Sequence, residues 1–265
     1  MTSDSSLARS YWGMVFAALV GASAVAAESP KTQGAKAQDT GAKTPELPKH
    51  PPAVRFDPVL RELEGWKVHV EPALVDGEQR EEGTKALAML ANHLQRIKIL
   101  VPAGPLAKLQ TIEIWVEHDH PRLKSMQYHP SRGWLVDHGC DPRLTRMVHI
   151  TQARELLSRA QMLKHPAMVL HELAHAYHDQ FLSFDHAEIL AAYKNARESG
   201  SYTNVLLYTG QKVKHYGLTD HKEYFAEGTE AYLYRNDFYP FVRAELKEHD
   251  AALHEVLLKV WGPAN

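Results

Sequence analysis

The chain has 265 residues but only one cysteine, Cys140. A single cysteine cannot form an internal disulfide, so the fold must be held by its apolar core and by any metal that it binds. Cys140 lies in the stretch Gly139-Cys140-Asp141-Pro142, a pattern typical of a turn. We therefore expect a structural thiol and not a nucleophile.

The chain also lacks an excess of charge of either sign. It contains 30 Lys and Arg against 32 Asp and Glu, a formal net charge of −2. This balance gives no electrostatic basis for binding nucleic acid or an anionic membrane. The sequence predicts no oligomeric state.

Long apolar runs are missing except near the N-terminus. There, Arg9 precedes an apolar run at residues 11–20, and small residues follow at 21–27. This is the layout of a secretory signal peptide at residues 1–27, ending at Ala27, with an uncleaved anchor as the alternative. We expect a secreted or periplasmic protein without stable membrane insertion after cleavage.

Residues 28–52 contain one large apolar residue, Leu47, among Lys, Thr, Gln, Gly, Ala and Pro. Such a segment cannot bury enough surface to offset its ordering entropy, which predicts a flexible linker. Residues 53–265 have no internal repeat, and their length suits one domain.

Hydrophobic periodicity in residues 53–265 predicts an α+β fold, with a small mixed sheet and a mostly helical C-terminal half. Strand, helix and strand in succession suggest a crossover connection. Strands are expected at 66–70, 111–117 and 147–150. Helices are expected at 58–63, 79–100, 152–163, 166–182, 187–198, 220–236, 241–248 and 251–260. Residues 202–217 fit either strand or loop.

Four histidines, His118, His120, His129 and His138, fall in a segment rich in loop-forming residues. Their spacing is irregular and does not match a metal motif. We expect surface or hydrogen-bonded histidines there.

The strongest chemical signal is His171-Glu172-Leu173-Ala174-His175. On a helix, histidines at i and i+4 lie on one face and can bind one zinc ion, while the glutamate can serve as general base. The pentapeptide alone is a weak signal in a chain with 17 histidines. Its apolar flanks strengthen it, because they predict a buried helix with a narrow polar stripe.

A catalytic zinc site takes three protein ligands and keeps one position for water. An extended motif with a third histidine at position 181 is excluded, because this residue is Phe181. The predicted helix at 220–236 places the carboxylates of Glu223, Glu227 and Glu230 on one side. One of them could bind zinc, and a neighbour one turn away could accept the outer N–H of a ligating histidine.

Two motifs together, His171 to His175 and Tyr216 to Glu227, resemble the anthrax toxin lethal factor-like zinc peptidases. The resemblance implies a zincin-like fold with His171, His175 and Glu223 as zinc ligands. It also implies that Tyr216 faces the oxyanion and that Glu227 stands behind the ligands.

We therefore expect an exported zinc-dependent peptidase, an endopeptidase rather than an exopeptidase, acting on a peptide or protein substrate. It would hydrolyse peptide bonds through a metal-activated water, with Glu172 as general base and Tyr216 as oxyanion donor. One alternative is a non-catalytic envelope or secreted binding protein whose structural zinc has a fourth ligand, Glu227 or His178. Another is a zinc hydrolase of a non-peptide amide or ester.

Overall fold

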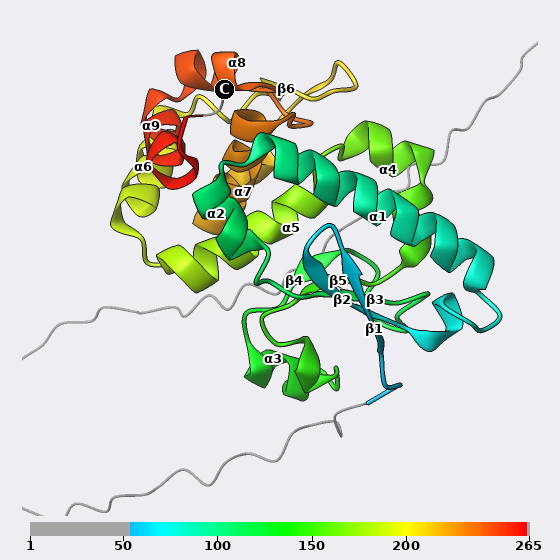
Figure 1. Cartoon of the computed structure of the whole chain (residues 1–265). Coiled ribbons are helices and arrows are strands. Elements are labelled where there is room, and N and C mark those ends of the chain that lie inside the picture. The colour runs from blue at the N-terminus through cyan, green and yellow to red at the C-terminus, as the bar shows by residue number, and fades with distance from the viewer. Residues whose placement is uncertain (1–53, 264–265) are drawn as a thin grey trace, which may run out of the picture. The chain divides into compact units, whose positions relative to one another are not determined.

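The computed structural model describes residues 54–263 (Figure 1). The predicted signal peptide at 1–27 and the linker at 28–52 lie outside the described residues. No helix in the described part is both long and apolar enough to cross a membrane.

A five-stranded mixed sheet has the order β1-β2-β3-β5-β4. The three central strands are parallel, and the two edge strands pair antiparallel with their neighbours. The strands are β1 (Val59–Leu63), β2 (Trp66–Val70), β3 (Ile114–Val116), β4 (Gln127–Tyr128) and β5 (Val148–Ile150). The expected strands at 66–70, 111–117 and 147–150 are thus confirmed, the last two with shorter bounds.

The helix expected at 58–63 is wrong, because this segment forms β1 and pairs with β2. The two strands are joined by Glu64 and Gly65, with φ angles of 53° and 93°. Two consecutive residues with positive φ form the kind of turn that closes a tight hairpin. The central residues of β1 are exposed, so its sequence carries little of the apolar alternation that marks a strand.

Helix α1 (Arg80–Leu100) crosses over between the parallel strands β2 and β3, as the periodicity predicts. Leu90, Leu94 and Ile97 form part of its buried face. Near its start, Gly83 lies so close to the backbone of Leu74 that an added Cβ would be 1.9 Å from the carbonyl oxygen. Only glycine allows this approach between α1 and the turn before it.

The C-terminal half is mostly helical, which confirms the α+β prediction (Figure 1). The helices after α1 are α2 (Ala103–Leu109), α3 (Arg132–Asp137), α4 (Arg159–Lys164), α5 (Met168–Tyr177), α6 (Ala187–Ser199), α7 (His221–Leu233), α8 (Arg243–His249) and α9 (Ala251–Trp261). The undecided residues 202–217 contain a short hairpin of β6 (Val205–Leu206) and β7 (Lys212–Val213).

Two predicted helices are not regular α-helices over their whole length. The segment 152–163 contains a 3-10 turn at Ala153–Leu157 and then α4, which begins where the Ser158 hydroxyl accepts the N–H of Gln161. The segment 166–182 contains α5 and then a π-helical turn at His178–Leu182. Such wide turns often occur at functional sites.

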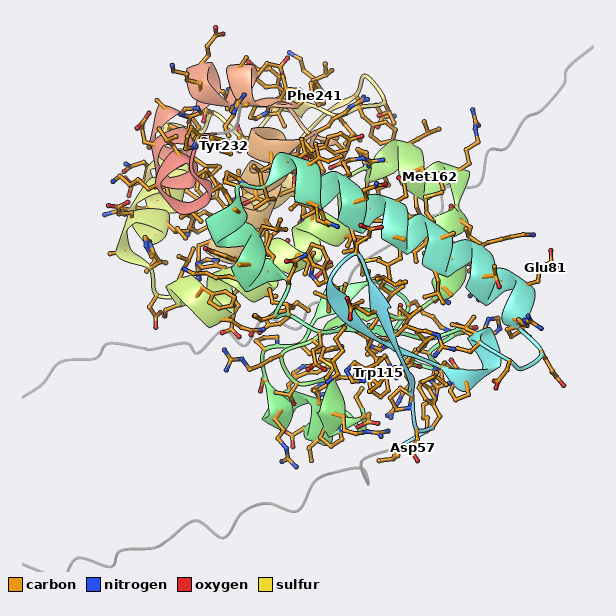
Figure 2. The ribbon with its side chains drawn as sticks, viewed as in Figure 1. Asp57, Glu81, Trp115, Met162, Tyr232 and Phe241 are labelled. Atoms are coloured by element: carbon orange, nitrogen blue, oxygen red, sulfur yellow. The ribbon has the colours of Figure 1, made fainter. Side chains whose placement is uncertain are left out.

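Helix α7 is buried over residues 223–233; its residue Tyr232 is labelled in Figure 2. Gly228 permits this packing, because an added Cβ would lie 2.5 Å from the Leu253 side chain on α9. The indole Nε1–H of Trp261, also on α9, donates to the Thr229 hydroxyl over 3.1 Å. The glutamates of α7 are therefore held inside the protein and do not form a solvated face.

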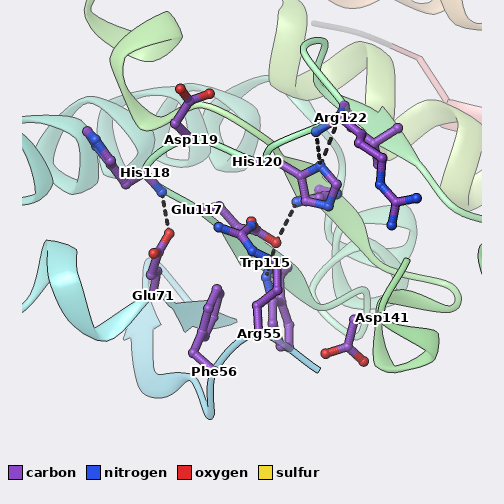
Figure 3. A network of polar contacts seen from close by, with 12 residues as sticks. Arg55, Phe56, Glu71, Trp115, Glu117, His118, Asp119, His120, Arg122 and Asp141 are labelled. Atoms are coloured by element: carbon purple, nitrogen blue, oxygen red, sulfur yellow. Dashed lines mark hydrogen bonds and ion pairs between the residues drawn. The ribbon is translucent and has the colours of Figure 1, made fainter. Parts of the chain in front are cut away.

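A second polar region lies along β3 and its following loop (Figure 3). The buried carboxylate of Glu117 accepts the Trp115 indole N–H and pairs with Arg55. His149 Nε2 lies 3.2 Å from the same carboxylate, and His149 Nδ1 lies 3.1 Å from His129 Nε2. This contact agrees with the expectation that the histidines of this region are hydrogen-bonded.

The other residues of that region also have identifiable environments. His120 Nδ1 accepts the backbone N–H of Arg122 over 3.3 Å (Figure 3), and it also accepts that of Leu123 over 2.9 Å. His118 Nδ1 lies 2.9 Å from Glu82 Oε1, and His138 is exposed. Cys140 is buried in a small apolar cluster, as expected for a structural thiol.

Candidate metal centre

Helix α5 presents His171 and His175 on one face, and their Nε2 atoms lie 3.1 Å apart. Most other side chains of this helix are buried and apolar, including Leu170 and Leu173. Packing of these residues fixes the rotation of the helix, so the two imidazoles face α7. Helices α5 and α7 make extensive contact.

Helix α7 brings Glu223 to the two histidines. Its Oε2 atom lies 3.2 Å from Nε2 of His171 and 3.3 Å from Nε2 of His175. The Asp220 carboxylate accepts the backbone N–H groups of Lys222 and Glu223 and so caps the helix. This cap starts α7 at His221, which places the Glu223 carboxylate in the first turn.

The three donor atoms fit a zinc ion. Two zinc ligands at about 2.0–2.1 Å and a tetrahedral angle lie about 3.3 Å from each other, and the sides of the observed triangle are 3.1, 3.2 and 3.3 Å. His171, His175 and Glu223 are also the chemical types that zinc accepts. Two imidazole nitrogens at such a distance need a proton or a cation between them.

The outer nitrogen of His171 determines its tautomer. Nδ1 lies 2.6 Å from Oε1 of Glu230, a carboxylate that can only accept when ionised. The N–H of a neutral His171 is therefore on Nδ1, and the lone pair of Nε2 faces His175 and Glu223. This is the arrangement that carboxylates impose on zinc-binding histidines.

The carboxylate behind His171 differs from the one expected. Glu227, to which the resemblance gives this place, has its nearest oxygen 3.9 Å from Nδ1 of His171, which is too long for a hydrogen bond. Helical geometry contains the signal for Glu230. Glu230 lies seven residues after Glu223, so the two side chains differ by only about 20° in direction around the helix axis. Glu227 differs from Glu223 by about 40° in the opposite sense.

Glu227 instead belongs to a buried acidic group behind the donor triangle. Burial and the charges of Glu230 and Asp237 raise the pKa of Glu227 well above its ordinary value. Burial and the charge of Glu230 raise the pKa of Asp237 to about 7. By contrast, His175 and His171 outweigh the burial of Glu223 and lower the pKa of its carboxyl group. Glu223 is thus the ionised ligand candidate, while Glu227 favours the neutral acid.

The side chain of Glu172, on α5, reaches the edge strand β4. Its Oε2 atom accepts the backbone N–H of Tyr128 over 2.9 Å. Burial raises the pKa of Glu172, although the nearby His171 and His175 oppose the shift. A carboxylate with a raised pKa is better suited to take and return a proton near neutral pH.

Tyr216 lies in a 3-10 turn, Tyr216–Leu218, before α7. Nδ1 of His215 accepts the N–H of Gly217 over 2.9 Å and holds this turn. Gly217 is in close contact, because an added Cβ would lie 3.2 Å from Cα of Tyr224. Burial and the charges of Glu223, Glu227 and Glu172 raise the pKa of Tyr216, so its hydroxyl stays protonated as a donor.

His178 does not join the donor triangle. Its ring is fully buried and packs against Phe184 and Phe225. Within residues 54–263, two groups could hold a metal by donor spacing: His171, His175 and Glu223, and His171 Nδ1 with Glu227 and Glu230. The second group needs Nδ1 of His171, and this nitrogen carries the proton that is donated to Glu230.

Comparison with known proteins gives a distant likeness to a solved structure. No family model and no curated protein sequence matches the chain. Among solved structures, the PRO-PRO endopeptidase PPEP-2 from Paenibacillus alvei is similar at 19% identity and a TM-score of 0.41, covering 73% of this chain and 96% of that one. A likeness of this size leaves the function to be argued from the residues of the chain itself.

Proposed function

We propose that the protein is an exported zinc-dependent peptidase of the zincin type. The observation that carries the proposal is the triangle of His171 Nε2, His175 Nε2 and Glu223 Oε2, with sides of 3.1 to 3.3 Å. The motif residues support membership of the lethal factor-like group. The N-terminal sequence supports export, and the substrate would be a peptide or a protein, cleaved internally.

Zinc held by these three residues would supply a Lewis acid that polarises a carbonyl and acidifies water. Glu172 takes the proton from the attacking water and passes it to the leaving amine, a role that suits its raised pKa. Tyr216 donates its hydroxyl hydrogen to the oxyanion as negative charge develops on the carbonyl oxygen.

The donor set supports a catalytic metal over a structural staple. A structural zinc site closes with four protein ligands, whereas a catalytic site uses three. Neither His178 nor Glu227, the two candidates for a fourth ligand, belongs to the donor triangle. His178 packs among aromatic rings, and Glu227 comes nearest to His171 at Nδ1, over 3.9 Å, and not at the Nε2 atom of the donor triangle.

The decisive experiment measures both the coordination of bound zinc and the cleavage of peptides. Zinc-loaded protein should show two imidazoles, one carboxylate and one non-protein oxygen by X-ray absorption spectroscopy. It should also cleave members of a mixed peptide library, detected by mass spectrometry, and lose this activity on chelation. Glu223→Ala should bind zinc at least about tenfold more weakly, because it loses a ligand. A four-ligand protein site, or no cleavage by metal-loaded protein, would contradict the proposal.

A further inference from the structure

Tyr128 of the edge strand β4 makes hydrogen bonds to α5, the helix of His171 and His175, and to the turn that follows it. Directly after β4, the N–H of His129 donates to the carbonyl of Met147 beside β5, whereas the N–H of Tyr128 in β4 donates to Glu172 on the opposite side. This alternation is normal for an antiparallel strand. The free edge of the sheet therefore directs one N–H at Glu172, the candidate base.

The same tyrosine contacts α5 and its extension a second time. Its hydroxyl donates to Oδ2 of Asp179 over 2.5 Å, in the π-helical turn. Gln180 Nε2 donates to the hydroxyl oxygen over 3.2 Å and to the Arg146 carbonyl over 3.0 Å. The side chain is thus fixed at its outer end by the segment that follows α5.

Glu172 and Asp179, the two residues that Tyr128 contacts, are seven positions apart, which is about two helical turns or about 10 Å along the axis. Tyr128 is 8% exposed, and burial together with Asp179 raises the pKa of its hydroxyl. The phenol therefore remains a protonated donor, and its bond to the Asp179 carboxylate is charge-assisted. Tyr128 fixes the distance and the orientation between β4 and α5.

We propose that Tyr128 and Asp179 are positioning residues for Glu172, an inference that rests on the proposed function. The Tyr128 N–H holds Oε2 of Glu172 and directs Oε1 toward the reacting water. The bond between the Tyr128 hydroxyl and Asp179 keeps that N–H in place. A base whose orientation is set before the reaction loses less entropy in the transition state.

Steady-state kinetics on a peptide that the parent cleaves tests whether Tyr128 and Asp179 position Glu172. Tyr128→Phe should lower kcat about tenfold, with KM within about twofold and zinc content unchanged, because only the alignment of the base is lost. Asp179→Leu should have the same effect. Asp179→Asn should keep more than about half of the parent kcat, since its amide oxygen still accepts the phenol hydrogen.

Tyr232→Phe is the matched control. Tyr232 is also buried, with 3% of its surface exposed, and its hydroxyl donates to the carbonyl of Gly262 over 2.9 Å at the end of α9. This variant should keep the parent kcat. The positioning role is wrong if Tyr128→Phe keeps the parent kcat, if Tyr232→Phe lowers kcat as much, or if Asp179→Asn fails as badly as Asp179→Leu.

Hydrogen exchange provides a readout that does not depend on hydrolysis. In zinc-loaded protein, the amide of residue 128 should exchange about tenfold faster in Tyr128→Phe and in Glu172→Ala than in the parent. Glu172→Gln should retain protection, because its amide oxygen can accept the same N–H. If the parent cleaves no peptide, the proposed function fails. The exchange rates still test whether Tyr128 and Asp179 hold the contact to Glu172. Unchanged exchange in Tyr128→Phe contradicts this positioning role.

Discussion

Nδ1 of His171 lies 2.6 Å from Oε1 of Glu230, and this contact orients the first histidine of the candidate metal centre. The carboxylate fixes the imidazole tautomer and increases the electron density on Nε2. Glu227, one turn earlier on the same helix, is 3.9 Å from the same nitrogen. The two glutamates therefore have different roles, and substitution can separate them.

Glu230→Gln should weaken zinc binding by about 10- to 100-fold, the usual effect of losing a carboxylate behind a zinc-binding histidine. Glu227→Gln should weaken it by less than about threefold, because its carboxyl group makes no hydrogen bond to His171. Competition with a chromophoric chelator measures both affinities under identical conditions. A larger loss in Glu227→Gln would show that the metal-loaded protein uses Glu227 instead.

Glu172→Gln should fold and bind zinc as the parent does, but its peptide hydrolysis should fall by at least about 10³-fold. Gln keeps the shape and the hydrogen bond to the Tyr128 N–H, yet it cannot accept a proton from water. Zinc content and hydrolysis rate of the same preparation give the comparison. Retention of most of the parent rate would remove Glu172 as the base.

Tyr216→Phe should lower kcat by about 100-fold or more with little change in KM or zinc content, as for loss of other single oxyanion donors. The substitution keeps the ring, so packing of the turn before α7 is preserved. A residue that only packs would leave kcat almost unchanged. A fall of less than about threefold on any peptide that the parent cleaves excludes the oxyanion role.

The buried histidines near Glu117 should make the fold sensitive to acid. Burial lowers the pKa of His149 to about 3 and that of His120 to about 4. An unfolded histidine has a pKa near 6.5, so below this pH the unfolded chain takes up protons that the folded chain does not. Each such histidine should reduce the unfolding free energy by up to about 1.4 kcal/mol per pH unit between about pH 6.5 and 4.

Urea unfolding of metal-free protein at several pH values between 7 and 5 measures this dependence without a contribution from zinc release. His149→Gln should have a shallower slope than the parent, because one titrating group is gone, even though it is less stable at pH 7. His138→Gln, at an exposed position, should keep the parent slope. An unchanged slope in His149→Gln would exclude His149 as a source of the acid sensitivity.

Local patterns in the sequence were sufficient for several features of the fold. The crossover helix α1 follows from its apolar spacing, and the start of α7 follows from Asp220 as a cap. These features depend on residues close together in the chain, where helical period and capping act. The sequence missed β1, because its exposed side chains give no periodic signal and only pairing with β2 makes it a strand.

For the site, the sequence by itself placed His171 and His175 on one helical face and limited the third ligand to the glutamates of α7, because helical period relates residues one or two turns apart. Only the tertiary structure decided which carboxylate meets which nitrogen, since the packing of α5 against α7 sets these distances. It also brought the Tyr128 N–H to Glu172. A backbone group has no side-chain identity to read, and the contact joins residues 44 positions apart.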